Sequence, residues 1–285
     1  MQSRLGAVRT AAVLAAIVAV GAAGCSSGGS SSSSPATKVS AMQELAATVK
    51  KMNDTQQVKT YVASLALQVG GIPGSSGDFS MAGTIESQRQ PSPLAEFDAS
   101  SFQMSGQSVG SMTEIVTPKA AYMKMPMLSA ELHKEWIELP FSSLKRNGAG
   151  LSQLISQAQD TDPLSATQLL AGAKNARTVG TGTVGGVAVT ELAGSEPINA
   201  GLAKLPASMR TSLGQEMEQL GVGQVTFQVW IDGQHDIRKA IVKEIGGTLN
   251  ETMSFTVTGI NQPVSISVPA PSQVATIPAS ALSGM

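Results

Sequence analysis

The chain has 285 residues and a formal net charge of −1, and only 14% of its residues are charged. Lysines and arginines form no cluster, which argues against binding to nucleic acid and against adsorption to acidic lipid head groups. Cys25 is the single cysteine, so an internal disulfide is excluded. The length suits one large domain or two small ones, and no second linker is apparent after residue 38.

The N-terminus has the pattern of a secretory signal peptide. Arg4 and Arg9 form a positive start before an uncharged, apolar run over residues 11–23, which is short for a membrane span. The run ends in Ala22-Ala23-Gly24-Cys25, which resembles the lipobox of bacterial lipoproteins. That resemblance implies cleavage before Cys25 and attachment of diacylglycerol to its thiol.

We therefore expect four segments along the chain. They are a signal peptide over residues 1–24, a lipidated cysteine with a Ser/Gly-rich tether over 25–37, a domain over 38–275 and a C-terminal tail over 276–285. The Ser/Gly tract has nothing to bury and is typical of a flexible linker. Two acyl chains on one residue suffice for stable anchoring, so we expect the protein on the extracytoplasmic face of the cell membrane.

Hydrophobic periodicity predicts the elements of the domain in chain order. Ser40 and Gln43 form a capping box, and apolar residues then recur at helical spacing as far as Asn53. Helical spacing returns over residues 151–158, 163–170 and 198–220, with Pro206 dividing the last segment. Alternation of apolar and polar residues predicts strands over 61–69, 79–85, 95–104, 108–116, 120–125, 136–139, 177–184, 187–193, 225–231, 237–245, 253–257 and 264–268.

Helices and strands segregate along the chain instead of alternating one for one. This order favours an α+β fold, in which helices pack on one face of an antiparallel sheet. A sheet with so many strands twists strongly and tends to curl around whatever covers its apolar side.

Two glycine-rich motifs mimic catalytic signatures. Residues 106–110 match the G-x-S-x-G nucleophile elbow around Ser108, and Asp160 and His235 follow in hydrolase order. Residues 180–185 match the dinucleotide-binding fingerprint. Both motifs need a helix directly after them, whereas the residues that follow each one alternate like a strand. We therefore interpret both as hairpins.

No residue set predicts a metal or cofactor site. His133 and His235 are the only histidines, they lie far apart in sequence, and we expect both in exposed turns. Trp136 and Trp230 lie in strand-like segments, where an aromatic ring usually packs against its neighbours. We expect no enzyme, no metal and no cofactor.

Segments spread over most of the domain carry a resemblance to a known family through their order and spacing. They are the opening helix before residues 61–69, Ala121-Tyr122-Met123-Lys124, Lys134-Glu135-Trp136-Ile137, Asp162-Pro163, Val179-Gly180, Gly185-Gly186-Val187, Val229-Trp230-Ile231-Asp232 with Arg238, and a last strand pair ending near Pro269. Together they resemble the LolA-like lipoproteins of actinobacteria, the LppX/LprG family.

The resemblance implies a half-barrel, in which the curved antiparallel sheet wraps over helices and encloses an apolar cavity for acyl chains of a lipid or lipoglycan. On that model the cavity lining would come from apolar strand residues. They are Leu65, Leu67, Phe79, Met81, Phe227, Val229, Ile241 and Phe255. The resemblance thus points to lipid transport or envelope assembly, with a membrane and a lipid as partners.

Two alternatives remain open from the sequence. The same apolar stripes could form an ordinary packed core, and the protein would then be a surface interaction or scaffolding lipoprotein without a ligand. A hydrolase that uses Ser108 is a minor alternative, which the hairpin interpretation disfavours.

Replacing Cys25 by Ala is expected to leave the protein unprocessed or released, because no acyl chain can then be attached. Fatty-acid labelling and cell fractionation measure this outcome, and Ser30→Ala in the tether serves as the matched control. The anchor hypothesis is wrong if Cys25→Ala follows the membranes as the wild type does and keeps its acyl label.

Overall fold

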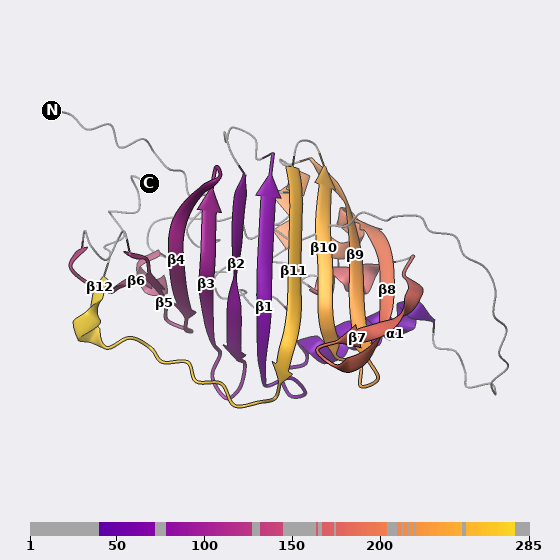
Figure 1. Ribbon diagram of the computed structural model, residues 1–285, viewed down its shortest axis with the longest axis horizontal. Coiled ribbons are helices and arrows are strands. Elements are labelled where there is room, and N and C mark those ends of the chain that lie inside the picture. The colour runs from indigo at the N-terminus through magenta and orange to yellow at the C-terminus, as the bar shows by residue number, and fades with distance from the viewer. Residues whose placement is uncertain are drawn as a thin grey trace.

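The alternating segments of the sequence form the strands of one large sheet in the computed structural model (Figure 1). The structure describes residues 40–71, 78–126, 132–144, 164, 167–173, 175–203, 210–211, 214–215, 217–218, 221–246 and 249–276. Residues 1–39, including the expected signal peptide, Cys25 and the tether, lie outside this set, as do residues 277–285 and the segment expected to be helical over 151–158.

Eleven long or medium strands and one short strand make up the described sheet. Their bounds are β1 Thr60–Gly70, β2 Phe79–Gln88, β3 Leu94–Met104, β4 Gln107–Val116, β5 Ala120–Lys124, β6 Trp136–Pro140, β7 Arg177–Val184, β8 Val187–Pro197, β9 Val222–Asp232, β10 Ile237–Gly246, β11 Leu249–Ile260 and β12 Val274–Thr276. Eleven of these twelve agree with the expected alternating segments, although several extend further than expected.

The strand order is β12-β6-β5-β4-β3-β2-β1-β11-β10-β9-β8-β7. Two meanders, β1 to β6 and β7 to β11, therefore meet where β1 pairs with β11. Tyr61 lies opposite Ile260 in that pairing, so the junction joins residues from the two ends of the domain. The described sheet is curved (Figure 1). It does not close into a barrel, because β7 and β12 lie at opposite edges.

The helical segments over residues 41–53, 167–172 and 198–202 lie on one side of the sheet, behind it in Figure 1. The expected opening helix is α1 (Ala41–Asn53), and its capping box is present because Ser40 Oγ accepts from the Gln43 N–H at 3.2 Å. α1 packs against the 3-10 helix η2 (Thr167–Gly172), which packs against α6 (Ile198–Leu202), and α6 contacts β8 and β9. α3 (Phe141–Leu144) follows β6 directly.

The strand predicted over residues 264–268 is wrong. Residues 262–270 have no regular secondary structure, and the chain continues through the 3-10 helix η3 (Pro271–Gln273) into β12. Pro263 and Pro269 flank the predicted strand, and neither can donate a backbone hydrogen bond to a ladder. Apolar side chains do alternate over residues 264–268, but the backbone there does not pair with a neighbouring strand. β12 pairs in parallel with β6, so the sheet is antiparallel throughout except at this edge.

Irregular pairing bends the sheet near its centre. The register shifts between Val62 and Ala63 in β1, and again at Ala82/Gly83 where β2 meets β3. A third shift lies between Ala99 and Phe102 where β3 meets β4. Such bulges increase local twist and bend a strand. At Gly83 the neighbouring backbone comes so close that a Cβ atom would lie 2.1 Å from the carbonyl oxygen of Asp98.

Replacing Gly83 by Ala is therefore expected to destabilise the protein by about 1–3 kcal/mol or more, since backbone rather than a movable side chain must give way. The change is measured by urea unfolding. Gly182→Ala in β7 is the control, because no atom lies within 4 Å of its added Cβ. Equal stability of the two variants would contradict the close approach.

Candidate functional site

Cross-strand pairing aligns apolar side chains of the central strands in rows on one face of the sheet. Residues directly opposite each other in neighbouring strands point to the same side. One such row is Val242, Met253, Leu67, Met81 and Phe102. The next is Ala240, Phe255, Leu65, Gly83, Ala99 and Met112. We call this side the inner face, because the apolar cluster that includes α1 residues packs there.

The inner face is closed over β8 to β11. Phe227, Val229 and Phe255 are 0–2% exposed and belong to one apolar cluster. The helical segments contribute Leu45, Leu170 and Leu202 to the same cluster. This half of the face is therefore packed as a protein core normally is.

The inner face is less completely covered over β2 to β4. Leu65, Phe79 and Met81 are only partly buried, although they pack against the edge of the cluster. The rings of Phe79 and Phe102 meet edge to face, with centroids 5.3 Å apart. Met104, which pairs with Phe79, is 38% exposed. Large apolar side chains thus continue along the face beyond the region that is fully packed.

Seven of the eight residues expected to line a cavity lie on the inner face, and Ile241 does not. Ile241 pairs with Ser254, and it lies between Lys239 and Lys243 on the outer face. The inward positions of β10 are Ala240, Val242 and Glu244. The sequence pattern misled because isoleucines and lysines share one phase of β10, and only the partner strand settles which phase faces inward.

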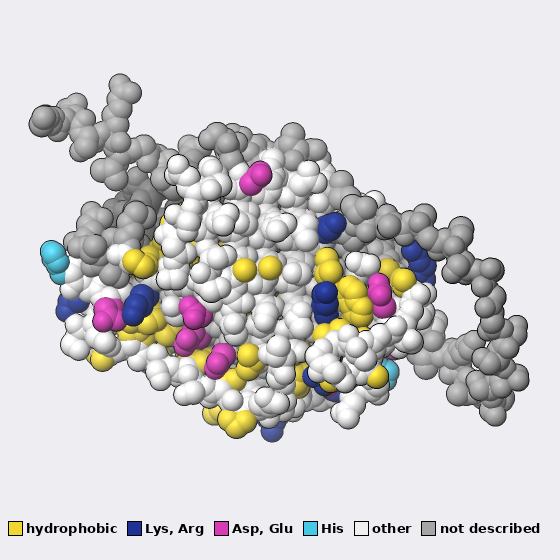
Figure 2. All heavy atoms as spheres, viewed as in Figure 1, with side chains coloured by type: hydrophobic (Ala, Val, Ile, Leu, Met, Phe, Trp, Pro, Cys, Tyr) yellow, Lys and Arg dark blue, Asp and Glu magenta, His cyan; other side chains and the backbone are white. Residues whose placement is uncertain are grey.

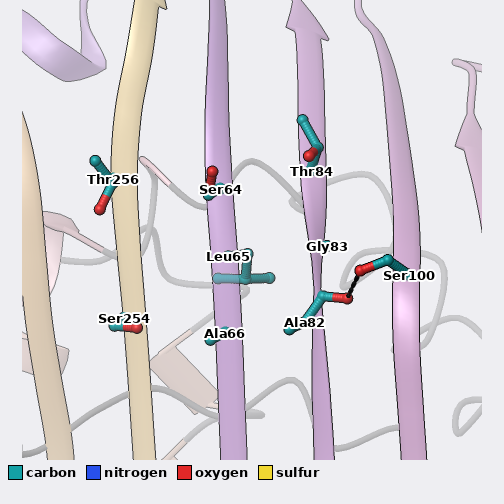
Figure 3. A pocket seen from close by; sticks show the side chains of 9 residues that line it. All are labelled: Ser64, Leu65, Ala66, Ala82, Gly83, Thr84, Ser100, Ser254 and Thr256. Atoms are coloured by element: carbon teal, nitrogen blue, oxygen red, sulfur yellow. Dashed lines mark hydrogen bonds between the residues drawn. The ribbon is translucent and has the colours of Figure 1, made fainter. Parts of the chain in front are cut away.

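The centre of the outer face, over β1, β2 and β11, carries small polar and apolar side chains. Figure 2 shows this face, where few charged or large apolar groups interrupt the centre of the sheet. A shallow hollow of about 390 Å³ lies there, and its lining is drawn in Figure 3. Ser64, Ser254 and Thr256 are among its lining residues, and Ser100 Oγ donates to the Ala82 carbonyl at 3.3 Å. This hollow is distinct from the expected apolar cavity.

A second hollow, of about 470 Å³, lies where α1 approaches the turn between β9 and β10. Its lining includes Lys51, Asp236 and Arg238, which together with Asp232 form a buried polar cluster. Lys51 Nζ lies 2.6 Å from Asp236 Oδ1 and donates to the Gln234 carbonyl at 2.8 Å. Arg238 Nε donates to Asp232 Oδ2 at 2.7 Å. The cluster thus fixes α1 to the end of the sheet.

Asp232 is held ionised within this cluster. Burial opposes its ionisation, but hydrogen bonds from the backbone N–H of Asp236 and from Arg238 outweigh burial and hold the pKa of Asp232 below its ordinary value. The N–H of Gln234 adds a further hydrogen bond at 2.8 Å. Such charge-assisted bonds are stronger than neutral ones.

Both hairpin interpretations are confirmed. The β3–β4 turn has Ser105 and Gly106 at φ 53° and 75°, and the β7–β8 turn has Gly185 and Gly186 at φ 56° and 80°. These are values that a two-residue hairpin turn requires. Ser108 lies exposed in β4 opposite Gln103. His133 and His235 are exposed at turns with positive φ, as expected.

The two tryptophans lie in strands, each beneath a lysine. The Lys239 ammonium lies 4.8 Å from the ring centroid of Trp230. The Lys124 ammonium lies 5.8 Å from the ring centroid of Trp136. Both rings are half-buried. Cation–π contacts of this kind contribute about 0.5–1 kcal/mol at exposed sites, so packing accounts for both residues.

Buried carboxyl groups on the inner face were not anticipated from the sequence. Glu244 and Glu251 are 1% exposed and lie directly opposite each other in β10 and β11. Glu114 in β4 pairs with Phe97, so it also faces inward, and although it is only partly buried, desolvation raises its pKa. The only signal in the sequence was that each glutamate shares the phase of an apolar neighbour two residues away.

No helix among the described residues is long and apolar enough to cross a membrane. No protein-family model matches the sequence, and no curated protein matches it by sequence. Among solved structures, the chain is similar to LprF from Mycobacterium bovis, with 15% sequence identity, a TM-score of 0.48, and coverage of 81% of this chain and 97% of that chain.

The chain is also similar to the lipoprotein LppX from Mycobacterium tuberculosis, at 18% identity and a TM-score of 0.44, over 78% of this chain and 98% of that one. A LolA superfamily protein from Nitrosomonas europaea matches at 8% identity and a TM-score of 0.28, over 80% of this chain and 96% of that one.

Replacing Asp232 by Asn is expected to lower the free energy of unfolding by about 1–3 kcal/mol at neutral pH, because Arg238 loses its charged partner. Because the pKa of Asp232 is lower in the folded than in the unfolded protein, its ionisation stabilises the fold at any pH above the unfolded pKa. This stabilisation is lost as the pH falls through the folded pKa. The difference in the free energy of unfolding between Asp232→Asn and the wild type should therefore become smaller at acid pH. Urea unfolding over a pH series measures it.

Asp98→Asn on the outer face is the control, since Asp98 is exposed and a surface change of this kind stays within about 0.5 kcal/mol. If the difference in the free energy of unfolding between Asp232→Asn and the wild type stays constant down to acid pH, Asp232 is not held ionised in the folded protein.

Proposed function

We propose that this protein is a membrane-anchored, extracytoplasmic lipoprotein that binds the acyl chains of a lipid on the inner face of its sheet. The observation that carries the proposal is the uneven cover of that face. Phe79, Met81 and Phe102 continue the apolar rows of the packed half, yet they remain partly accessible. Contiguous apolar surface that a protein does not cover with its own side chains marks a site for an apolar partner.

The chemistry of the face suits hydrocarbon. Phe, Met and Leu offer no hydrogen bonds, and methionine adapts its shape to irregular neighbours. Each methylene moved from water onto such a surface gains about 0.8 kcal/mol, whereas one moved from a bilayer gains almost nothing. Uptake from a membrane and release to another acceptor are then nearly balanced, which suits a carrier.

Membrane attachment is the second part of the proposal, and it rests on the sequence alone. Arg4, Arg9 and the lipobox-like Ala22-Ala23-Gly24-Cys25 support export and acylation of Cys25. A domain held at the bilayer surface meets lipid at high local concentration. We therefore propose a role in lipid transport or envelope assembly, without catalysis.

A scaffolding lipoprotein with a filled core is the competing function. The complete burial of Phe227, Val229 and Phe255 favours it for β8 to β11, where no space for a ligand is left beside these residues. The two functions differ in what they predict for β2, because only lipid binding requires an accessible apolar surface there.

The test uses the mature chain with Cys25→Ser, which carries no acyl anchor, and a fluorescent fatty-acyl probe. Met81→Trp should abolish probe binding while the melting temperature is nearly kept, because the ring occupies space that the acyl chain would use. Val229→Trp is the matched control. It should cost about 1–3 kcal/mol or more of stability, because Val229 is 0% exposed and has no room for a larger side chain.

Solvent extraction and mass spectrometry of the same preparation should recover bound lipid from the wild type in stoichiometric amount. A wild type that binds no probe and yields no lipid, together with a large loss of stability in Met81→Trp, would favour the filled core.

A further inference from the structure

Glu114 is the one acidic side chain that the described pairing places at the open end of the inner face, over β3 to β5. It lies opposite Phe97 in β3 and Met123 in β5. Phe97 in turn lies opposite Ile85, which belongs to the apolar cluster. The carboxyl group therefore interrupts an otherwise apolar row.

The environment of Glu114 is unusual for a glutamate. Its side chain is neither fully buried nor exposed, and yet desolvation is strong enough to raise its pKa, with no nearby charge contributing. By contrast, burial and the like charges of Glu86 and Asp98 both raise the pKa of Glu96 on the outer face.

Other acidic residues near this edge have partners within the described structure. Glu138 accepts from the Tyr122 hydroxyl at 3.2 Å and from Thr276 Oγ1 at 2.9 Å. Glu135 pairs with Lys124 at 2.9 Å. The structure shows no hydrogen bond or ion pair of the Glu114 side chain with any other described residue. A polar group in apolar surroundings is costly unless something satisfies it.

We propose that the Glu114 side chain contacts the polar head of the bound lipid and thereby selects a neutral, hydroxyl-bearing acylglycerol over a fatty-acid anion. This inference rests on the proposed function, since it needs an acyl chain on the inner face. A carboxyl group can accept a hydrogen bond from a lipid hydroxyl, or donate one to an ester carbonyl when it is protonated. A fatty-acid carboxylate in the same place would meet a second carboxyl group in surroundings of low polarity. Either the two charges repel each other or one of the two groups must take up a proton, and both cost free energy at neutral pH.

The experiment compares a monoacylglycerol with the fatty acid of the same chain length, at neutral pH, as competitors for the fluorescent acyl probe on the mature Cys25→Ser chain. The wild type is expected to prefer the monoacylglycerol on the order of tenfold or more. Glu114→Gln keeps the shape of the side chain and a carbonyl acceptor, but it cannot ionise. It should retain monoacylglycerol binding and reduce the preference to about threefold or less.

Glu114→Leu is the second variant, and it should bind the monoacylglycerol more weakly and show no preference, while its melting temperature is kept or raised. Glu96→Gln on the outer face is the control and should keep the wild-type preference. Equal preference in the wild type and Glu114→Gln, with the probe bound by both, would overturn the role of Glu114 and leave the proposed function intact. A wild type that binds neither lipid nor probe would overturn both.

Discussion

The pairing of β1 with β11 is the constraint on which the rest of the structure depends. Each meander is assembled from strands that follow one another in sequence. Among the described strands, only this ladder joins the two meanders, from Tyr61 opposite Ile260 to Gly70 opposite Asn250. Pairing of segments so distant in sequence forms late and slowly, because the intervening chain must first be ordered. Without this ladder, the apolar rows of β2 and β10 would not share one face.

Once joined, the two halves of the inner face behave differently. The half formed by β8 to β11 is filled by α1, η2 and α6, whose side chains bring Leu45, Leu170 and Leu202 into its cluster. The polar cluster of Lys51, Asp232, Asp236 and Arg238 fixes the end of α1 to this same half. The helical segments therefore cover this half more completely than they cover β2 to β4, where Phe79, Met81 and Phe102 are only partly buried.

Local signals predicted most of the fold and only part of the site. The capping box at Ser40 and the alternation in β1, β2 and β9 were sufficient to place those elements, because each signal is complete within a short stretch of chain. The sequence did not reveal which residues of β10 face inward, because Ile241 and Val242 are equally apolar. Only the pairing with β11 distinguishes them. The inward position of Glu114 depends in the same way on Phe97, a residue of another strand.

The short strand β12 has a consequence for how the molecule behaves among its neighbours. β6 would otherwise end the sheet with a row of unsatisfied backbone groups, which is a template on which another chain can add a strand. Val274–Thr276 occupies that row in parallel, and the chain reaches it through residues interrupted by Pro269 and Pro271. Three residues are too few to offer a useful ladder in turn. The domain thus covers the β6 edge with its own chain, and of the two edges of the described sheet only β7 presents a longer strand to another chain.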